Sequence, residues 1–255
     1  MQIIEEKKVF KIPSTIKEGA KFPFCPGCDH GIAIRLVAEV LEELNLKEKT
    51  LAVASSGCSV FLYNWLDVDC VESPHGRAMA VATGIKRTNP DKFVFTYQGD
   101  GDFASIGLAE SLHASLRGEK ISAICINNTT YGMTGGQAGP TTIMGQVTTT
   151  SPTGRNKEYY GYPIKTAEQI ALCDGTAFSA RSSVDTVANI RKTKDLIRKA
   201  FQAQIKGLGT GFVEIVSSCP TNWRMTPQKA HDRIRNELFP IYKPGIYKEN
   251  EELNK

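Results

Sequence analysis

The order of apolar segments predicts an α/β protein with a parallel sheet flanked by helices. Four segments are rich in β-branched and aromatic residues and almost continuously apolar, as buried parallel strands are. Helix-like segments separate them, and this alternation is typical of a parallel sheet covered on both faces. The expected strands are 50–55, 92–98, 121–127 and 211–218, and the expected helices are 31–44, 76–87, 104–117 and 185–205.

The remaining segments predict a single domain with one long loop. A repeat-free chain of 255 residues is long enough to bury one core. We expect residues 1–242 to form that domain and the charged segment 243–255 to be a tail, on the surface or against a partner. The stretch 129–165 is rich in Thr, Gly and Pro, and a loop of this length is usually functional or disordered.

Charge and hydropathy exclude several classes of function. The net charge of +4 is spread along the chain, without the dense basic runs of nucleic-acid-binding proteins. No apolar run approaches the roughly 20 residues of a membrane helix, and the N-terminal stretch 1–14 lacks the apolar core of a signal peptide. The seven cysteines are an odd number, unlike a disulfide framework. We therefore expect a cytoplasmic protein with free thiols and neither a nucleic-acid nor a membrane partner.

Chemically active residues follow each of the four expected strands. Cys58 follows the first, Gly-Asp-Gly at 99–101 the second, Asn-Asn at 127–128 the third and Cys219 the fourth. Ligands of open parallel sheets bind beyond the carboxyl ends of the strands. Packing alone does not explain such residues at four strand ends, so we expect a functional site there.

The Gly-Asp-Gly and Asn-Asn pairs predict a site for a divalent cation and a diphosphate. Asp100 and Asn128 can supply hard oxygen ligands, which Mg²⁺ takes together with phosphate oxygens and water. Glycines and a following helix N-terminus let a diphosphate approach the backbone. A Gly-Asp-Gly sequence alone is more often a plain turn, but the asparagine pair after 25 intervening residues favours the cation.

Four of the seven cysteines lie near expected loops. Cys25 and Cys28 form a Cys-x-x-Cys pair in the stretch PFCPGCDHG, and Cys58 and Cys219 lie at strand ends. The pair alone suits a redox dithiol, and with two distant cysteines it suits Zn²⁺ or a [4Fe–4S] cluster equally by ligand count. We expect Cys125 to be a core residue and Cys70 and Cys173 to be inert.

The Gly-Asp-Gly and Asn-Asn spacing resembles the thiamine diphosphate motif. By that resemblance Asp100 and the side chain of Asn128 hold Mg²⁺, with the carbonyl of Thr130 as the third ligand. With SGCS, HGR, YGMTGGQ and CPTNW in order, the chain resembles the β subunit of 2-oxoacid:ferredoxin oxidoreductases from about Phe22 to Trp223. The implied fold is a thiamine diphosphate-binding domain of the diphosphate type.

This resemblance implies both the activity and the cofactors. The reaction is the CoA-dependent oxidative decarboxylation of a 2-oxoacid to acyl-CoA and CO₂, with electrons passing through a [4Fe–4S] cluster to ferredoxin. The cofactors are thiamine diphosphate, Mg²⁺ and the cluster, with coenzyme A as co-substrate. The implied cluster ligands are Cys25, Cys28, Cys58 and Cys219, and the segments lining the cofactor include Ser56, Gly57, Cys58, Ser59, His75, Gly99, Gly101, Asp102, Gly132 and Met133.

Partner chains are also implied. Thiamine enzymes use a glutamate of a second domain, for which this chain leaves no room, so α and γ subunits and a ferredoxin-like δ subunit are expected to supply the missing parts. No basic residue comes directly after Ser59, where Val60 and Phe61 stand. We therefore favour a branched-chain substrate, 2-oxoisovalerate, with 2-oxoglutarate second.

Two other functions and one residue remain open at this point. The chain also fits half of a non-redox thiamine decarboxylase or synthase with structural zinc, or a non-catalytic scaffold stabilised by zinc. Asp29 stands where many members of the family have glycine. It is expected to cap the helix that starts near Gly31, and the alternative is a carboxylate that lowers the potential of the cluster.

Overall fold

The structure is a computed structural model that describes residues 11–255. Residues 1–10, including most of the stretch judged not to be a signal peptide, lie outside the described part. A seven-stranded sheet forms the centre, in the order β2-β1-β3-β4-β8-β7-β9. Its strands are β1 (Thr50–Ala54), β2 (Asp69–Glu72), β3 (Phe93–Gly99), β4 (Ser122–Asn127), β7 (Thr176–Ser183), β8 (Thr210–Val216) and β9 (Gly245–Glu249).

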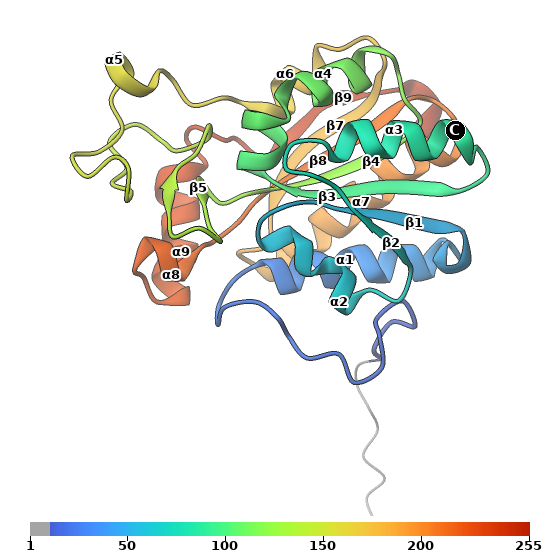
Figure 1. Ribbon diagram of the computed structural model, residues 1–255, viewed down its shortest axis with the longest axis horizontal. Coiled ribbons are helices and arrows are strands. Elements are labelled where there is room, and N and C mark those ends of the chain that lie inside the picture. The colour runs from blue at the N-terminus through green and yellow to red at the C-terminus, as the bar shows by residue number, and fades with distance from the viewer. Residues whose placement is uncertain (1–10) are drawn as a thin grey trace, which may run out of the picture.

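Six of these strands run parallel, and only β9 is antiparallel to its neighbour. Helices cover both faces of the sheet (Figure 1), so the predicted α/β fold is confirmed. All four predicted strands and all four predicted helical segments form. The helices are α1 (His30–Glu43), α2 (Leu62–Trp65), α3 (Ala78–Thr88), α4 (Leu108–Leu116), α5 (Lys157–Tyr160), α6 (Thr166–Ala171), α7 (Val187–Ile205), α8 (Pro220–Trp223) and α9 (Pro227–Arg233), with short turns at Cys58–Phe61, Asp102–Ile106 and Ile234–Leu238.

Two apolar layers explain the patterns in the sequence. On one face α1 and α7 pack on the sheet through residues such as Ile34, Val37 and Phe201. On the other face Met79 of α3 packs near Phe103 and the α4 and α6 side chains. The central strands are covered on both faces and therefore read as continuous apolar runs. These layers leave only the strand ends free to present polar groups.

The C-terminal segment differs from the tail that its charge predicts. Residues Gly245–Glu249 form β9, which pairs with β7 and protects an edge of the sheet. Two of its charged side chains have local partners: the Nζ of Lys199 lies 2.6 Å from Glu249, and the Nζ of Lys248 donates to the carbonyl of Cys173 at 2.7 Å. Leu253 beyond the strand is buried. The segment is therefore part of the sheet.

The long stretch 129–165 is ordered around a buried arginine. It begins with the two-stranded ribbon of β5 (Thr130–Tyr131) and β6 (Gln137–Ala138) and projects from the body beside α8 and α9 (Figure 1). The guanidinium of Arg155 donates to the carbonyls of Gly139 and Thr142 at 2.8 and 2.9 Å. These bonds satisfy backbone groups that a loop leaves open. Among the described residues no helix is both long and apolar enough to cross a membrane.

Candidate cofactor and metal site

Sheet register brings the two halves of the predicted cation site together. Gly99 at the end of β3 pairs with Ile126 near the end of β4, in a parallel arrangement. Asp100 and Asn128 follow directly, so both leave the sheet at the same edge. The two side chains are almost fully buried, with 2% and 7% of each residue exposed. The strand order, which the sequence alone does not reveal, thus joins residues that are distant in the chain.

A cavity of about 270 Å³ opens at this edge. The glycine backbone and the side chains of several loops form its wall. Three further residues line it that the sequence analysis did not single out: His30, Tyr131 and Thr134. Tyr131 and Thr134 belong to the YGMTGGQ segment, which could have indicated them. All predicted cofactor and Mg²⁺ residues line the cavity: Ser56, Gly57, Cys58, Ser59, His75, Gly99, Asp100, Gly101, Asp102, Asn128, Thr130, Gly132 and Met133.

Asp100 is a buried carboxyl without an ion-pair partner among the described residues. Burial raises its pKa from 3.8 to about 7, although bonds from the Thr141 hydroxyl and the amides of Gly101 and Thr129 counteract the rise. A divalent cation would remove this penalty by pairing with the charged form. The donor chemistry of the site therefore fits Mg²⁺.

The asparagine corner, residues 127–130, is built from two short turns, each closed by an asparagine side chain. The Oδ1 of Asn127 accepts the amide of Thr129 at 3.2 Å, and the Oδ1 of Asn128 accepts the amide of Thr130 at 3.1 Å. Thr129 has a φ of 61°, in the left-handed region that β-branched residues rarely adopt. Such a conformation persists only where its surroundings enforce it. The strain at Thr129 is therefore a mark of a functional turn.

Glycines leave room for a ligand at the same edge. A Cβ atom on Gly57 or Gly99 would meet nothing within 4 Å, so the backbone of both residues is open to the cavity. At Gly101 the opposite holds, because a Cβ atom would lie 2.3 Å from the ring of Tyr131. Only glycine allows that ring to close over the loop. Together these positions form a cradle of the size and polarity that a diphosphate requires.

His75 is oriented toward the cavity by a buried carboxylate. Its Nδ1 lies 2.5 Å from the Oδ1 of Asp102, which also accepts the amide of Gly76 at 2.7 Å. The second oxygen of Asp102 accepts a bond of 2.5 Å from Gln98. The side chain of Asp102 is buried, whereas that of His75 is 39% exposed. His75 thus has a fixed ring whose Nε2 has no hydrogen-bond partner within residues 11–255, which favours a role in binding over a helix cap.

The four predicted cluster cysteines occupy one region of the molecule. All are free thiols, with Cys25 exposed and Cys28, Cys58 and Cys219 half-buried. The pKa of Cys28 is raised to about 12, mainly by burial and to a smaller extent by the neighbouring Cys219 and Cys58. Burial likewise raises the pKa of Cys58 to about 11, with added contributions from Cys219 and Cys25. The thiolate forms would repel one another here, so a bound metal would be needed to stabilise them together.

The thiols do not surround a single metal ion. Within residues 11–255, no group of three or more His, Cys, Asp or Glu side chains is placed to hold one ion. A zinc ion would hold its sulfur ligands about 3.8 Å from one another, the separation that tetrahedral Zn–S bonds of about 2.3 Å give. A [4Fe–4S] cluster would distribute its thiolates over four irons, so its sulfur ligands would lie farther apart. Cys125 is fully buried in the core, as expected.

Asp29 does not cap α1, so that expectation is wrong. Its side chain makes no capping bond and turns toward the end of β8. One oxygen accepts the amide of Ser218 at 2.6 Å, and the other lies 2.8 Å from the Nε2 of His231. The Ser218 hydroxyl also donates to the carbonyl of Gly27 at 3.1 Å. This clamp joins the Cys-x-x-Cys loop to the residue before Cys219, and the Asp29 bond raises the pKa of His231.

A second cavity, of about 740 Å³, is larger but lies beside the site. It is lined by the Gly135–Gly136 turn and by residues 221–225. Arg233 covers its rim, with the guanidinium 4.4 Å from the ring centre of Trp223. It contains neither Asp100 nor the asparagine corner. The smaller cavity is therefore the candidate cofactor site, because the buried carboxyl and the glycine cradle meet there.

The fold and the site define a class, and comparison with known proteins agrees with it. Residues 55–215 match the family model described as "Thiamine pyrophosphate enzyme, C-terminal TPP binding domain". A solved structure of 2-oxoglutarate:ferredoxin oxidoreductase from Magnetococcus marinus superimposes with a TM-score of 0.77 at 24% identity, covering 96% of this chain and 87% of that one. At that identity it supports the fold alone. The class is thus a thiamine diphosphate-binding domain.

Curated relatives narrow the class to one family. The ketoisovalerate oxidoreductase subunit VorA of Methanothermobacter thermautotrophicus is 41% identical over 92% of this chain. The 2-oxoglutarate synthase subunit KorB of Methanocaldococcus jannaschii is 39% identical over 78% of this chain and 69% of its own length. The chain belongs to the family of 2-oxoacid:ferredoxin oxidoreductase subunits, as the motifs predicted. It spans about half the length, 52%, of the VorA relative.

Proposed function

We propose that this chain is the thiamine diphosphate-binding β subunit of a 2-oxoacid:ferredoxin oxidoreductase. The observation that carries the proposal is the pairing of Asp100 with Asn128 at adjacent strand ends, above a cavity whose wall is largely glycine backbone. A buried carboxyl without an ion-pair partner and an open cradle are what a cation with a diphosphate requires.

In this proposal the chain's own residues hold the diphosphate half of the cofactor. Mg²⁺ is bound by the Asp100 carboxylate, the Asn128 side chain and the Thr130 carbonyl. The open backbone of Gly57 and Gly99 cradles the diphosphate. Thiamine diphosphate, when bound, supplies the electron sink for decarboxylation. The glutamate that activates its pyrimidine ring is expected on a partner chain.

The four cysteines are proposed to hold a [4Fe–4S] cluster beside the cofactor. Cys58 lines the cofactor cavity and influences the pKa of Cys28 electrostatically. It therefore stands between the two sites. A cluster at Cys25, Cys28, Cys58 and Cys219 would accept electrons close to the reacting carbon and pass them to ferredoxin, since electron transfer needs proximity.

We propose a branched-chain 2-oxoacid, 2-oxoisovalerate, as the substrate, with 2-oxoglutarate as the second candidate. Among the residues that the structure describes, no lysine or arginine lines the cavity to pair with a distal carboxylate. Two relatives 41% identical are named ketoisovalerate oxidoreductase subunits, against 39% for a 2-oxoglutarate synthase subunit. The products are acyl-CoA and CO₂, and coenzyme A is the co-substrate. We further propose α, γ and ferredoxin-like δ partners and a cytoplasmic location.

Metal analysis of the anaerobically purified protein tests this proposal. We expect iron and acid-labile sulfide in equal amounts, together with thiamine diphosphate and magnesium. Zinc without iron would defeat the redox assignment and favour a decarboxylase or synthase. Absence of Mg²⁺-dependent thiamine diphosphate binding would defeat the cofactor assignment and favour a scaffold. For the substrate, kcat/KM of the complex for 2-oxoisovalerate should exceed that for 2-oxoglutarate.

A further inference from the structure

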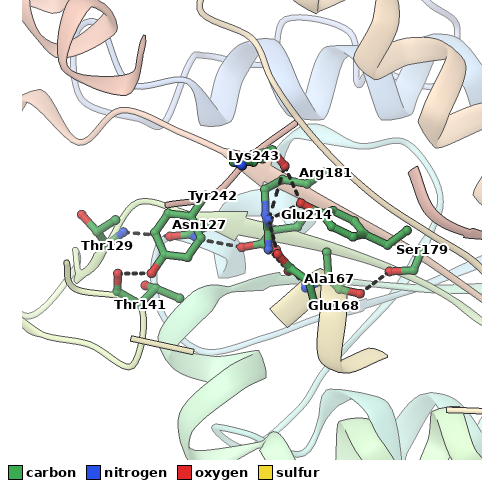
Figure 2. A network of polar contacts seen from close by, with 11 residues as sticks. Asn127, Thr129, Thr141, Ala167, Glu168, Ser179, Arg181, Glu214, Tyr242 and Lys243 are labelled. Carbon is green, nitrogen blue, oxygen red and sulfur yellow. Dashed lines mark hydrogen bonds and ion pairs between the residues drawn. The ribbon is translucent and has the colours of Figure 1, made fainter. Parts of the chain in front are cut away.

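A buried polar network joins the C-terminal segment, at Tyr242 and Lys243, to Asn127 and Thr141, which support the proposed cation ligands (Figure 2). At its centre is Arg181 of β7, whose side chain is fully buried. Its Nε donates to the Oε2 of Glu214 at 2.9 Å, and its Nη1 donates to the Oε1 of Glu168 at 3.0 Å. The first pair is inaccessible to solvent on both sides, whereas Glu168 is partly exposed. A buried charge pair of this kind is weak evidence for stability, so its placement calls for another explanation.

One arm of the network reaches the asparagine corner. The second oxygen of Glu214 accepts the Nδ2 of Asn127 at 2.6 Å. The other end of the same amide, Oδ1, holds the amide of Thr129 at 3.2 Å. Asn127 therefore has both ends of its side chain fixed, one by the network and one by the left-handed Thr129. Through this bond the network sets the turn that presents Asn128 and Thr130.

The other arm reaches the carboxyl ligand. The hydroxyl of Tyr242 donates to the carbonyl of Thr141 at 2.5 Å. The hydroxyl of Thr141 donates in turn to the Oδ2 of Asp100. Both Tyr242 and Thr141 are fully buried, so water does not compete for these bonds. Tyr242 thus holds the loop whose threonine orients Asp100.

Arg181 ties the two arms to the C-terminal segment. Its guanidinium lies 5.3 Å from the ring centre of Tyr242 and 5.1 Å from that of Tyr247. Its Nη1 also donates to the Tyr247 hydroxyl at 2.7 Å. Tyr247 lies in β9, the strand that pairs with β7. Residues 242–247 therefore contact Thr141 and Arg181, the residues through which the two arms hold the proposed ligands Asp100, Asn128 and Thr130.

We propose that residues 242–247 and Arg181 are positioning residues for the cation site, acting through Tyr242–Thr141–Asp100 and through Arg181–Glu214–Asn127. The inference rests on the proposed Mg²⁺ and thiamine diphosphate binding and deepens it. The ligands have their binding geometry only while the C-terminal segment is docked on β7. This explains why a charged C-terminal segment is built into the sheet and why its tyrosines pack against a buried arginine.

Replacement of Tyr242 by phenylalanine isolates the first arm. The variant removes one hydroxyl and keeps the ring packed on Arg181. The matched control is Tyr160→Phe, which removes a hydroxyl bonded to the carbonyl of Thr150 outside the site. Mn²⁺ serves as the probe, because its electron paramagnetic resonance signal reports both the free ion and the symmetry of the bound one. The full chain, purified with any chains that accompany it, is titrated with Mn²⁺ at saturating thiamine diphosphate.

We expect Tyr242→Phe to weaken Mn²⁺ binding about 3- to 10-fold, the effect of one lost buried hydrogen bond, and to change the spectrum of the bound ion. Tyr160→Phe should leave both unchanged, and Tyr242→Phe should stay folded without the cation, with an unfolding temperature only a few degrees below that of the wild type. Arg181→Lys, which keeps the charge but loses the forked geometry, should weaken binding at least as much. Tyr242→Phe remains informative if Arg181→Lys does not fold.

The outcomes separate this inference from the function on which it rests. Tight Mn²⁺ binding by the wild type, with an unchanged dissociation constant and spectrum in Tyr242→Phe, would overturn the positioning role alone. Failure of the wild type to bind Mn²⁺ with thiamine diphosphate would overturn the cation site and the inference together. A loss of stability in Tyr242→Phe without any change in Mn²⁺ affinity would also reject the positioning role.

Discussion

The oxygen site (Asp100, Asn128 and Thr130) and the cysteine region (Cys25, Cys28, Cys58 and Cys219) lie next to each other but are built in opposite ways. Asp100 and Asn128 leave adjacent paired strands, and each is held by a hydrogen bond in a buried setting. The cysteines come from three segments far apart in the chain, and Cys25 is exposed. They depend on the Asp29 clamp, a contact between residues 189 positions apart. The oxygen site is thus preformed by the sheet, whereas the positions of the thiols depend on loops.

The largest change in ligand affinity should come from a substitution that removes a ligand of the oxygen site and leaves the cysteine region intact. Asp100→Asn removes the charged ligand and keeps its shape, so Mg²⁺ affinity should fall at least about 100-fold, beyond the 10- to 100-fold typical of outer partners. Isothermal titration with Mg²⁺ at saturating thiamine diphosphate measures this change. The iron content should stay at the wild-type level. Parallel loss of iron would show that the two regions are not independent.

A substitution in the cysteine region should have the reverse effect, lowering the iron content without weakening cofactor binding. Cys219→Ser should lower the iron and sulfide content to roughly a tenth or less, because serine is a poor ligand for iron–sulfur clusters. Thiamine diphosphate binding should persist. Cys173→Ser, whose thiol lies outside the region, is the control for both measurements. A Cys219→Ser protein with full iron content would remove this residue from the proposed ligand set.

Without a bound cation, burial of the Asp100 carboxyl in the preformed oxygen site should lower the free energy of unfolding by an amount that depends on pH. Burial raises the pKa of Asp100 to about 7 in the folded chain, from its ordinary value of 3.8. The folded state therefore binds the proton more tightly, and stability without a cation should fall as pH rises from about 4 to 7. At about 1.4 kcal/mol per pKa unit, discounted for water in the cavity, the loss is about 2 kcal/mol.

Urea unfolding at pH 5 and pH 8 without divalent ions, compared between wild type and Asp100→Asn, measures this term. The variant should be relatively more stable at pH 8, and the difference should vanish at pH values where Asp100 is protonated. Adding Mg²⁺ with thiamine diphosphate should restore the wild type at pH 8. An equal difference at both pH values would show that burial does not raise the pKa of Asp100.

The smallest effect should come from the clamp that joins the cysteine segments. Asp29→Asn keeps one acceptor but loses the charge opposite His231, at a cost of about 1–2 kcal/mol for a hydrogen bond to a charged group. In the metal-free chain, Cys25 and Cys28 should then react several-fold faster with a thiol reagent, read with mass-spectrometric mapping. The exposed Asp174→Asn serves as control. Unchanged rates would mean that Asp29 does not hold the loop.

The sequence anticipated the central strands because each is buried on both faces and therefore apolar throughout. β7 escaped prediction, since its TAFSARSS sequence is polar, and its buried Arg181 and serines are satisfied by partners that only the fold supplies. β9 escaped for the same reason, because Lys248 and Glu249 look like a solvated tail until Cys173 and Lys199 are placed beside them. The role of Asp29 was missed because Ser218 and His231 are remote in the chain.

By itself the sequence determined the class of fold, the strand ends and the residues that follow them, since these depend on local periodicity and on which groups come after an apolar run. It also determined the family, through motifs in a fixed order. Only the tertiary structure decided which strands are neighbours, and therefore that Asp100 meets Asn128 at one edge. It also decided which charges are buried together, because pairing such as that of Arg181 with Glu214 is set by the sheet and not by separation along the chain.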